Sequence, residues 1–385
     1  MHFFITIVSL LAFAAWVYLI ALHGRFWSSL PVLEPCTAGL LTRTCVAKVA
    51  VIVPARDEAE SIRQSLGSLL RQDYPGELAI ILVDDNSSDG TAEIAAVLDG
   101  TGRLAIVAGA PLPAGWSGKL WAVHQGLAHS QARAADYVLL TDADIVHTPG
   151  HVSALVAKAE AGNLDLVSEM VRLHCTSAAE RALIPAFVFF FQMLYPFAWV
   201  AAPRRRTAGA AGGTMLLRRA ALDGVEGVSR IRGELIDDCA LAKEIKGAGG
   251  RIWLGHAEHA ASMRVYARWR DVWEMIARTA YVQLDYSPWM LLGCVAGMGL
   301  VFCAPPLLAL FSPGLPRLFA AAAWLMMAVA FQPTLRRYRR SPLWGIALPA
   351  ISLFYLGATV ASAARHYTGR GGAWKNRVYP EQKKP

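Results

Sequence analysis

The chain has 385 residues, of which 55% are hydrophobic and only 17% are charged, and its formal net charge is +8. Soluble domains carry roughly 25% charged residues, so this composition argues against an ordinary soluble protein and favours a membrane protein with long apolar runs. Basic residues lie between and after these runs, which favours a membrane surface over nucleic acid as their partner. The six cysteines show no CxxC spacing, so neither a zinc site nor a disulfide framework is predicted.

The first predicted element is an uncharged apolar run over residues 3–22, FFITIVSLLAFAAWVYLIAL. A membrane span needs about 20 apolar residues to cross the hydrocarbon core, and this run is long enough. A cleaved signal peptide is the alternative. However, the run lacks a basic n-region and a clear small-x-small cleavage site. We therefore predict a retained N-terminal transmembrane anchor over residues 1–24.

Residues 47–285 alternate short apolar strands with helices and are predicted to form one α/β domain. Strands are expected at 48–55, 78–85, 104–109 and 136–144, and helices at 57–72, 91–98 and 118–130. Strands that are apolar throughout and separated by helices favour a parallel sheet that is covered on both faces. We therefore expect a mostly parallel sheet.

Acidic side chains follow three of these predicted strands. They lie in the segments PARDE (54–58), DDNSSDG (84–90) and DAD (142–144). Ligands of open α/β sheets bind beyond the carboxyl ends of the strands. Three acidic clusters at one edge would repel one another unless something cationic joined them, so we interpret this edge as a ligand site.

Asp142 and Asp144 end the last of these strands, one residue apart. Alternate residues of an extended strand point the same way, so both carboxylates can face one hard divalent cation. Alternatively, one binds the metal and the other holds a sugar hydroxyl. A solvated turn or a helix cap is the simpler explanation of an Asp-x-Asp pair, and the two similar strand ends nearby favour the metal.

The segment VDDNSSDGT (83–91) also suits a turn, with Ser88 or Asp89 capping the next helix. Asp84 or Asp85 would then remain to accept hydrogen bonds from a base or a ribose. The sequence has no GxxxxGK[ST] motif, so this is not a Walker-type phosphate site.

The segments VAVIVPARDEAESI, VDDNSSDGT, GKLWAVHQG and LLTDADI occur in this order along the chain. With this spacing, residues 48 to about 285 resemble the family 2 glycosyltransferases, which have the GT-A fold. The N-terminal anchor and C-terminal spans make the whole chain similar to the hopanoid-associated (hopene-associated) membrane glycosyltransferases and, more distantly, to the ceramide glucosyltransferases. The resemblance implies a nucleotide-diphospho-sugar transferase-like domain that uses a nucleotide sugar and Mg²⁺ or Mn²⁺.

The resemblance also implies roles for individual residues. The metal ligands would be Asp142 and Asp144, and the donor would contact Pro54, Arg56, Glu58, Asp84, Asp85, Lys119 and Asp142. Asp57 stands where many members have Asn, and His124 stands where Asn is usual, which leaves the role of His124 open.

Asp238 corresponds to the general base of the family, with Asp237 in place of a Glu. Such a carboxylate takes a proton from the acceptor hydroxyl, while the metal stabilises the leaving diphosphate in an inverting displacement. Both acids also suit the cap and first turn of the helix that follows, and the two explanations are compatible.

Five further residues are predicted, on weaker grounds, to contact the acceptor or the diphosphate: Gly213, Thr214, Asp237, Arg268 and Trp269. Glycine would let the backbone approach a ligand before the strand MLLRR, although a simple turn explains it equally well. Arg268-Trp269 falls where processive relatives carry Gln-x-x-Arg-Trp, and Val265 replaces the Gln, which argues against a polymerase. His256 and His259 are within possible reach of the metal, but surface histidines are the commoner explanation.

The C-terminal transmembrane region is predicted over residues 286–366, followed by a basic tail at 367–385. It contains apolar stretches at 289–311, 317–335 and 342–364, the first two interrupted by Pro305-Pro306 and Pro333. Three spans after a cytoplasmic domain would place Arg336–Arg340 inside, as the charge rule requires, but would place the basic tail outside, which the rule disfavours. The number of spans therefore stays open. We expect a multi-pass protein of the bacterial inner membrane with a cytoplasmic catalytic domain.

LIPAFVFFFQMLYPFAWVAA (183–202) is also long enough to span. A span there would put Asp144 and Asp238 on opposite sides of the bilayer, so we predict an interfacial segment instead. Arg204–Arg206 would then lie at the head groups. A buried core helix is the alternative.

These features predict a membrane-bound, inverting glycosyltransferase that moves a sugar from a nucleotide diphosphate to a lipid hydroxyl. The resemblance indicates a UDP-sugar and a hopanoid-type acceptor. The alternatives are another lipid (ceramide, diacylglycerol, carotenoid or polyprenyl phosphate) or a catalytically silent membrane scaffold with the same fold. A solute transporter is disfavoured, since the apolar spans contain almost no internal charge. The sugar, the acceptor and the oligomeric state are left open.

Overall fold

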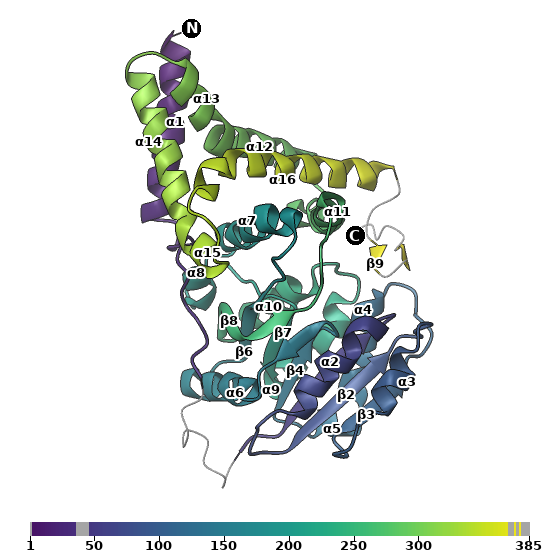
Figure 1. The fold of residues 1–385 in the computed structure, drawn as a ribbon. Helices are drawn as coiled ribbons and strands as arrows, with labels where there is room; N and C mark the ends of the chain where they lie inside the picture. Colours follow the sequence, from purple (N-terminus) through teal and green to yellow (C-terminus); the bar gives the residue numbers. More distant parts are fainter. Residues whose placement is uncertain (1, 36–45, 369–372, 375–376, 379–385) are drawn as a thin grey trace. The chain divides into compact units, whose positions relative to one another are not determined.

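The computed structural model describes residues 2–35, 46–368, 373–374 and 377–378 (Figure 1). The chain forms two compact units, which we describe separately. The helical unit comprises Met1–Ser29, Cys175–Ala198 and Val265–Gly372, and the sheet unit comprises Leu30–His174, Trp199–Arg264 and Ala373–Pro385. Cys36, Cys45 and most of the predicted basic tail lie outside the described residues.

The sheet unit is built on an eight-stranded sheet with the order β3-β2-β1-β4-β7-β6-β8-β5. The first four of these strands are parallel, β7 is antiparallel to both its neighbours, β6 is parallel to β8, and β5 is antiparallel to β8. The prediction of a mostly parallel α/β sheet is therefore confirmed. The strands are β1 (Val49–Ala55), β2 (Leu78–Asp84), β3 (Leu104–Ala108), β4 (Tyr137–Thr141), β5 (Ile145–His147), β6 (Leu166–Arg172), β7 (Thr214–Arg218) and β8 (Ile252–Ser262).

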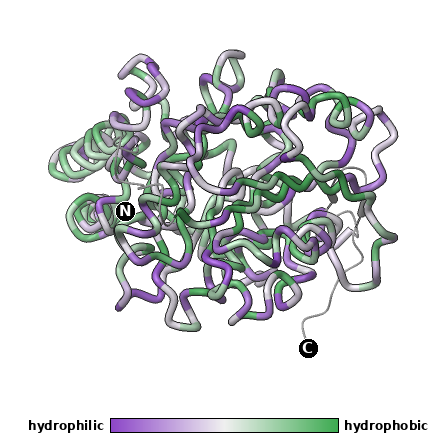
Figure 2. The backbone as a smooth tube through the Cα atoms, turned by 90° about the horizontal axis from the view of Figure 1, so that it is seen from below, coloured by the Kyte–Doolittle hydropathy of each residue, from purple (hydrophilic) through white to green (hydrophobic). Residues whose placement is uncertain are grey.

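The helices of the sheet unit follow the apolar patterns of the sequence. α2 turns Ile62, Leu66 and Leu69 into the core, where all three are fully buried. Burying a side chain of this size stabilises the fold by about 1.5–3 kcal/mol relative to exposure. In Figure 2 the green colour through the middle of the tube marks hydrophobic segments, in agreement with the apolar sequences of β1, β2 and β4. The helices are α2 (Ala59–Leu70), α3 (Thr91–Ala96), α4 (Gly118–Ala128), α5 (Ser130–Arg133), α6 (His151–Gly162), α9 (Arg219–Gly224), the 3-10 helix η1 (Gly227–Ile231) and α10 (Asp237–Gly247).

The register of the sheet brings distant segments of the chain to one edge. Ala55 at the end of β1 pairs with Asp84 at the end of β2, and Thr141 at the end of β4 pairs with Thr214 at the start of β7. The carboxyl ends of three parallel strands therefore meet the loop that precedes β7. This is the edge at which ligands of open α/β sheets bind.

The last predicted strand is shorter than expected. β4 ends at Thr141, and residues 142–144 form a turn before β5, with the Ile145 N–H donating to the Asp142 carbonyl at 3.2 Å. The expectation that Asp142 and Asp144 share one face of an extended strand is therefore wrong. The turn gives the two carboxylates different partners.

The helical unit contains the long apolar helices. They are α1 (His2–Ala21), α7 (Ala178–Leu194), α11 (Trp269–Thr279), the 3-10 helix η2 (Val282–Leu284), α12 (Pro288–Met298), the π-helical turn η3 (Gly299–Cys303), α13 (Ala304–Phe311), α14 (Leu315–Ala330), α15 (Gln332–Arg337) and α16 (Trp344–Tyr367). α8 (Phe197–Ala201) falls at the boundary of the two units, and β9 (Ala373–Trp374) pairs antiparallel with β10 (Arg377–Val378).

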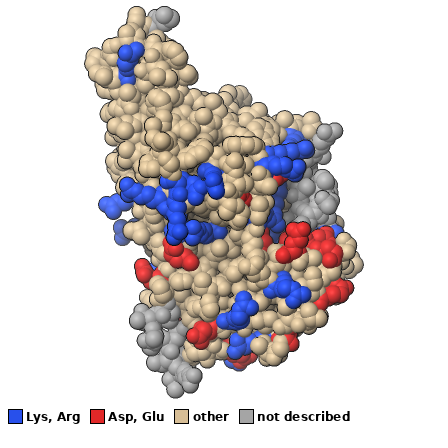
Figure 3. Space-filling view, viewed as in Figure 1, with Lys and Arg blue, Asp and Glu red and all other residues tan. Residues whose placement is uncertain are grey.

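In the part of the chain that the structure describes, five helical segments are long and apolar enough to cross a membrane: His2–Ala21, Ala178–Ala201, Pro288–Phe311, Leu315–Arg337 and Trp344–Tyr367. Pro305 and Pro306 do not end the third segment. They lie in the first turn of α13, directly after the π-helical turn η3, and such a turn accommodates the missing proline N–H. Figure 3 shows that α1, α13 and α14 present surfaces with few charged side chains.

α7 forms part of the core of the helical unit. Its Phe189 is fully buried, with ring centroids 5.2 Å from Phe26 and 5.1 Å from Phe331. The Tyr355 hydroxyl donates to the Leu183 carbonyl at 2.8 Å. In the structure α7 therefore packs with the other apolar helices of its own unit.

Candidate active site

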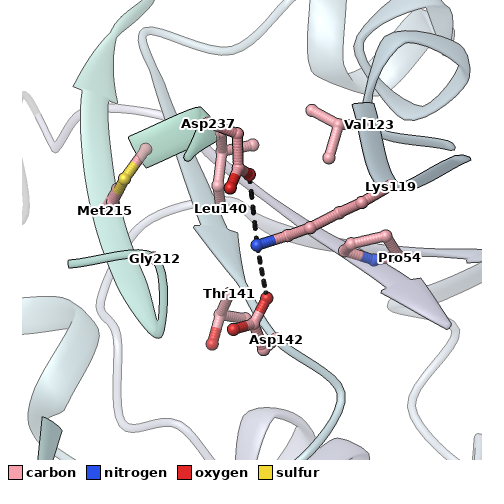
Figure 4. Close-up of a pocket in the computed structure, with 9 residues that line it drawn as sticks. All are labelled: Pro54, Lys119, Val123, Leu140, Thr141, Asp142, Gly212, Met215 and Asp237. Carbon is pink, nitrogen blue, oxygen red and sulfur yellow. Dashed lines mark ion pairs between the residues drawn. The ribbon is translucent and has the colours of Figure 1, made fainter. Parts of the chain in front are cut away.

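A pocket lies at the carboxyl edge of the sheet (Figure 4), and Lys119 crosses it. The Lys119 Nζ lies 2.9 Å from Asp142 Oδ1 and 3.1 Å from Asp237 Oδ2. The structure thus brings together a helix start, a strand end and the Asp-Asp segment, which are far apart in the sequence. The lining residues are Pro54, Lys119, Val123, Leu140, Thr141, Asp142, Gly212, Met215 and Asp237.

Lys119 is positioned by the start of α4. Ser117 is the N-cap, and its Oγ accepts from the Leu120 N–H at 3.4 Å. The Ser117 N–H donates to the Arg232 carbonyl at 2.7 Å, which ties this turn to the segment before α10. Burial by itself lowers the pKa of Lys119, but the surrounding carboxylates outweigh it and raise that pKa well above its usual value. The side chain is therefore a permanent positive charge in the pocket.

Asp238 lies beside this charge, in the first turn of α10. Its Oδ2 accepts from the Gly212 N–H and its Oδ1 from the Cys239 N–H, both at 2.7 Å. Burial, followed by repulsion from Asp237, raises the pKa of Asp238 to about 6, against the opposing effects of Lys119 and the two N–H groups. A carboxylate with such a pKa suits a general base that works near neutral pH.

Gly212 allows this close arrangement. A Cβ at this position would lie 3.3 Å from Asp238 Oδ2 and 3.4 Å from Lys119 Nζ, which is tight for a methyl group. Gly213, which the sequence favoured, packs against the core instead, since a Cβ there would meet both γ-carbons of Val171 at 2.9 Å. Thr214 is fully buried in β7. The Gly-Gly pair was thus visible in the sequence, but only the fold identifies which glycine lies in the pocket.

Asp144 points to a second cation. Its Oδ2 lies 3.0 Å from Arg264 Nε, and Arg264 Nη2 lies 3.5 Å from Glu58 Oε1. Arg264 follows β8 and was not predicted as a site residue. Its neighbours in the sequence do not identify it, because its partners Glu58 and Asp144 follow β1 and β4.

The donor set of Asp142 and Asp144 is compatible with a hard divalent cation. Among the described residues, no group of three or more His, Cys, Asp or Glu side chains is arranged to hold a metal. Mg²⁺ is usually bound through one or two carboxylates together with substrate phosphates. Two carboxylates therefore fit a metal that arrives with a nucleotide diphosphate, and they do not form a complete protein site.

The end of β2 forms the other part of the edge. Asp85 is 1% exposed, and Arg56 Nη1 donates to its carbonyl at 2.5 Å and lies 3.6 Å from its Oδ2. Asp84 Oδ2 accepts weakly from the Ser87 N–H at 3.3 Å. Among the described residues, the buried Oδ1 of Asp84 has no hydrogen-bond partner. An acceptor left without a donor is costly when buried, so this oxygen is suited to a hydroxyl or N–H of a ligand.

The loops around this end are tied together by Asp57. Its φ of 50° is left-handed, a region that Asp and Asn adopt more readily than most residues, so the exchange of Asn for Asp at this position is conservative. Asp57 Oδ1 accepts from the Ser88 N–H at 2.8 Å. The N-cap of α3 is Gly90, but the predicted Asp89 still serves the first turn, because its Oδ1 accepts from the Thr91 N–H at 3.1 Å. Asp89 Oδ2 also accepts from the Ala59 N–H.

A buried chain of hydrogen-bonded polar groups starts at Thr141, directly before the turn at residues 142–144. The Thr141 hydroxyl donates to the Gly213 carbonyl at 2.8 Å and lies 3.1 Å from His147 Nε2. The chain continues from His147 Nδ1 to His151 Nδ1 at 2.8 Å, and from His151 Nε2 to Glu169 at 2.6 Å. A hydroxyl has one proton, so His147 must donate to Thr141, and His151 must then donate to His147 if the His147 ring is neutral.

This chain needs a protonated Glu169 if both imidazoles are neutral. Burial lowers the pKa of His147 well below its usual value and that of His151 to about 3. Burial thus favours neutral rings, and with both rings neutral the donor to His151 would be the fully buried Glu169. Sequence reasoning missed this chain, because its members look like unrelated core residues.

Arg268 and Trp269 belong to the helical unit, where the Arg268 N–H donates to Asp271 at 2.9 Å and Trp269 is 51% exposed. His124 stacks on Trp121, with ring centroids 5.4 Å apart. His256 is 1% exposed, so the expectation of a surface histidine is wrong at that position.

Comparison with known proteins matches residues 50–225 to the family described as glycosyl transferase family 2. The structure of the mannosyltransferase PcManGT from Pyrobaculum calidifontis, in complex with GDP-Man and Mn²⁺, has a TM-score of 0.54 at 19% identity. That similarity covers 94% of this chain and 99% of the other. The family match supports a family 2 glycosyltransferase domain within residues 50–225, and the structural similarity shows the GT-A fold alone.

Two further structures are more distant. TarS 1–349 from S. aureus, in complex with UDP-GlcNAc, has a TM-score of 0.40 at 14% identity over 84% of this chain and 92% of that one. Glucosyl-3-phosphoglycerate synthase from Mycobacterium tuberculosis, in complex with phosphoglyceric acid, has a TM-score of 0.43 at 17% identity. That similarity covers 66% of this chain and 85% of the synthase chain.

Proposed function

We propose that this glycosyltransferase of family 2 and GT-A type moves a sugar from a nucleotide diphosphate to a hydroxyl of a membrane lipid by one inverting displacement. The observation that carries the proposal is the Asp238 carboxylate. Two backbone N–H groups fix it near Lys119 and Asp237, and its pKa is raised to about 6. These are the properties of a positioned general base.

The donor would lie along the carboxyl edge of the sheet. The unpaired Asp84 Oδ1 is available to a base or ribose donor group, and Asp85 is held by Arg56. Pro54 and Asp142 line the pocket. Glu58 and Asp144 both contact the guanidinium of Arg264. The diphosphate would therefore lie close to Lys119, whose permanent positive charge suits phosphate oxygens.

The reaction needs one proton transfer and one displacement. Asp238 takes the proton of the acceptor hydroxyl, whose oxygen forms the new bond to the anomeric carbon. The bond from that carbon to the diphosphate oxygen breaks on the opposite face, and the nucleoside diphosphate leaves with the electron pair. Lys119 stabilises the charge that develops on it. A metal held by Asp142 and Asp144 would supply further neutralisation of the diphosphate when bound.

The helical unit favours a lipid acceptor. Five segments long and apolar enough to span would hold the enzyme in the membrane that contains such a substrate. α15 carries Arg336 and Arg337 in its last turn, and this favours the cytoplasmic side for that end. The choice of a UDP-sugar and of a hopanoid-type acceptor, in a bacterial inner membrane, rests on the sequence resemblance.

The test uses the purified full-length protein in detergent or lipid. It is offered UDP- and GDP-sugars, Mn²⁺ or Mg²⁺, and a bacterial lipid extract that contains hopanoids, and new glycolipids are followed by mass spectrometry. Asp238→Asn should lower kcat by about 10²–10⁴-fold and leave donor affinity nearly unchanged. Asp223→Asn is the matched control, because this carboxylate is 57% exposed and pairs with Arg219 at the surface.

A new lipid mass that depends on Asp238 would support the proposal and identify both donor and acceptor. Full activity of folded Asp238→Asn would contradict the assignment of the base. If well-folded wild-type protein gave no product and bound no sugar nucleotide, a catalytically silent scaffold would be the better explanation.

A further inference from the structure

Arg264 holds the predicted metal ligand Asp144 in the structure. The Nε–Oδ2 distance is 3.0 Å, whereas the guanidinium lies 3.5 Å from the Glu58 carboxylate. The side chains of Asp144 and Glu58 are 13% and 15% exposed, and that of Arg264 is 39% exposed. One cation therefore neutralises two acids that are mostly shielded from water.

The backbone of Arg264 is anchored while its charged end is near solvent. The Met263 N–H donates to the Asp144 carbonyl at 2.9 Å, and the Arg264 N–H donates to Ser262 Oγ at 3.2 Å. Ser262 in turn pairs with Ile145 between β5 and β8. The side chain thus starts from a fixed point beside the turn, and its guanidinium can change partners without a change of backbone.

Lys119 and Arg264 differ in how firmly their charged groups are held. Lys119 is fixed between two carboxylates at 2.9 and 3.1 Å, so it remains in the pocket. Arg264 lies 3.0 Å from Asp144 and 3.5 Å from Glu58, and its side chain is 39% exposed, whereas that of Lys119 is 22% exposed. A divalent cation at Asp144 would lie within a few ångströms of the guanidinium, and two positive charges at that distance repel each other.

We propose that Arg264 is an internal cation that occupies Asp144 until the donor binds and then transfers to the diphosphate. This inference rests on the proposed function. The planar guanidinium binds phosphate oxygens in a two-pronged geometry, and Glu58 keeps it beside the turn during the exchange. The same side chain therefore opposes binding of the metal alone and favours binding of the metal together with a nucleotide diphosphate.

The two effects have opposite signs, which makes them testable. Removing the charge should strengthen the binding of Mn²⁺ alone and weaken the binding of nucleotide in the presence of Mn²⁺. A residue that only supports the fold would weaken both. Because no turnover is needed, the test does not depend on knowing the acceptor.

The experiment uses full-length protein in detergent, with Mn²⁺ binding measured by electron paramagnetic resonance and binding of UDP and GDP by calorimetry. Arg264→Met keeps the length of the apolar stem and removes the charge, and Arg264→Lys keeps the charge. Arg63→Met, an exposed arginine of α2, is the control. For Arg264→Met we expect the Kd of Mn²⁺ to fall by about tenfold and the Kd of the nucleotide at saturating Mn²⁺ to rise by about tenfold. Arg264→Lys should lie between this variant and the wild type.

Two results would overturn the inference. One is a folded Arg264→Met protein with unchanged Mn²⁺ and nucleotide affinities, and the other is a loss of both affinities with a lowered thermal midpoint. The proposed function would survive either result if the wild type still binds a sugar nucleotide. Failure of the wild type to bind any UDP- or GDP-sugar would refute the proposed function itself.

Discussion

Replacing Lys119 with Met should shift the pH dependence of activity to higher pH. The pKa of Asp238 is raised to about 6 by burial and by Asp237, and Lys119 opposes that rise. Without the ammonium group, the proton of Asp238 is held more tightly. A smaller fraction of Asp238 is then ionised at each pH. As the pH is lowered, the variant therefore loses activity at a higher pH than the wild type does.

The size of the shift follows from the distance between the two groups. A Cβ on Gly212 would lie 3.3 Å from Asp238 Oδ2 and 3.4 Å from Lys119 Nζ, so these two atoms are within about 7 Å of each other. At this distance and an effective dielectric constant of about 20–40, a unit charge contributes about 1–2 kcal/mol. That energy corresponds to a shift of about one pH unit.

The assay is kcat/KM for the donor over about pH 5 to 9, which reports the ionisation of the free enzyme. Lys119→Arg keeps the charge and should leave the acid limb near its original position, even if its KM changes. An acid limb that stays in place, or moves to lower pH, in folded Lys119→Met would refute both the role of Asp238 as the base and its coupling to Lys119.

Two further changes test the surroundings of the site. Glu169→Gln keeps an N–H that donates to His151 and should change the thermal midpoint of the full-length protein little. Glu169→Ala leaves the ring nitrogen without a donor and should cost about 1–3 kcal/mol; equal losses in both variants would exclude a protonated Glu169. Gly212→Ala places a methyl group 3.3 Å from Asp238 Oδ2 and should lower kcat by about tenfold through displacement of the base. Gly100→Ala, whose methyl group would meet nothing within 4 Å, is its control, and equal activity of the two would contradict the argument.

The sequence determined those features that arise from local pattern. Continuous apolar strands with intervening helices predicted the sheet, because each strand buries both faces whatever its neighbours are. The positions of Asp84, Asp142 and Asp238 at strand and helix ends followed from the same pattern together with the family resemblance. Long apolar runs were equally readable, since length and composition alone decide whether a helix suits a membrane.

Only the tertiary structure decided which charged groups meet. Lys119 lies between Asp142 and Asp237, and Arg264 lies on Asp144, because the register of the sheet brings their segments to one edge. The turn after β4 separates two carboxylates that a continuing strand would have aligned, and the pairing of α7 with other apolar helices depends on aromatic contacts across the chain. Electrostatic partners act over a few ångströms of space and not along the sequence, so no spacing of residues could identify them.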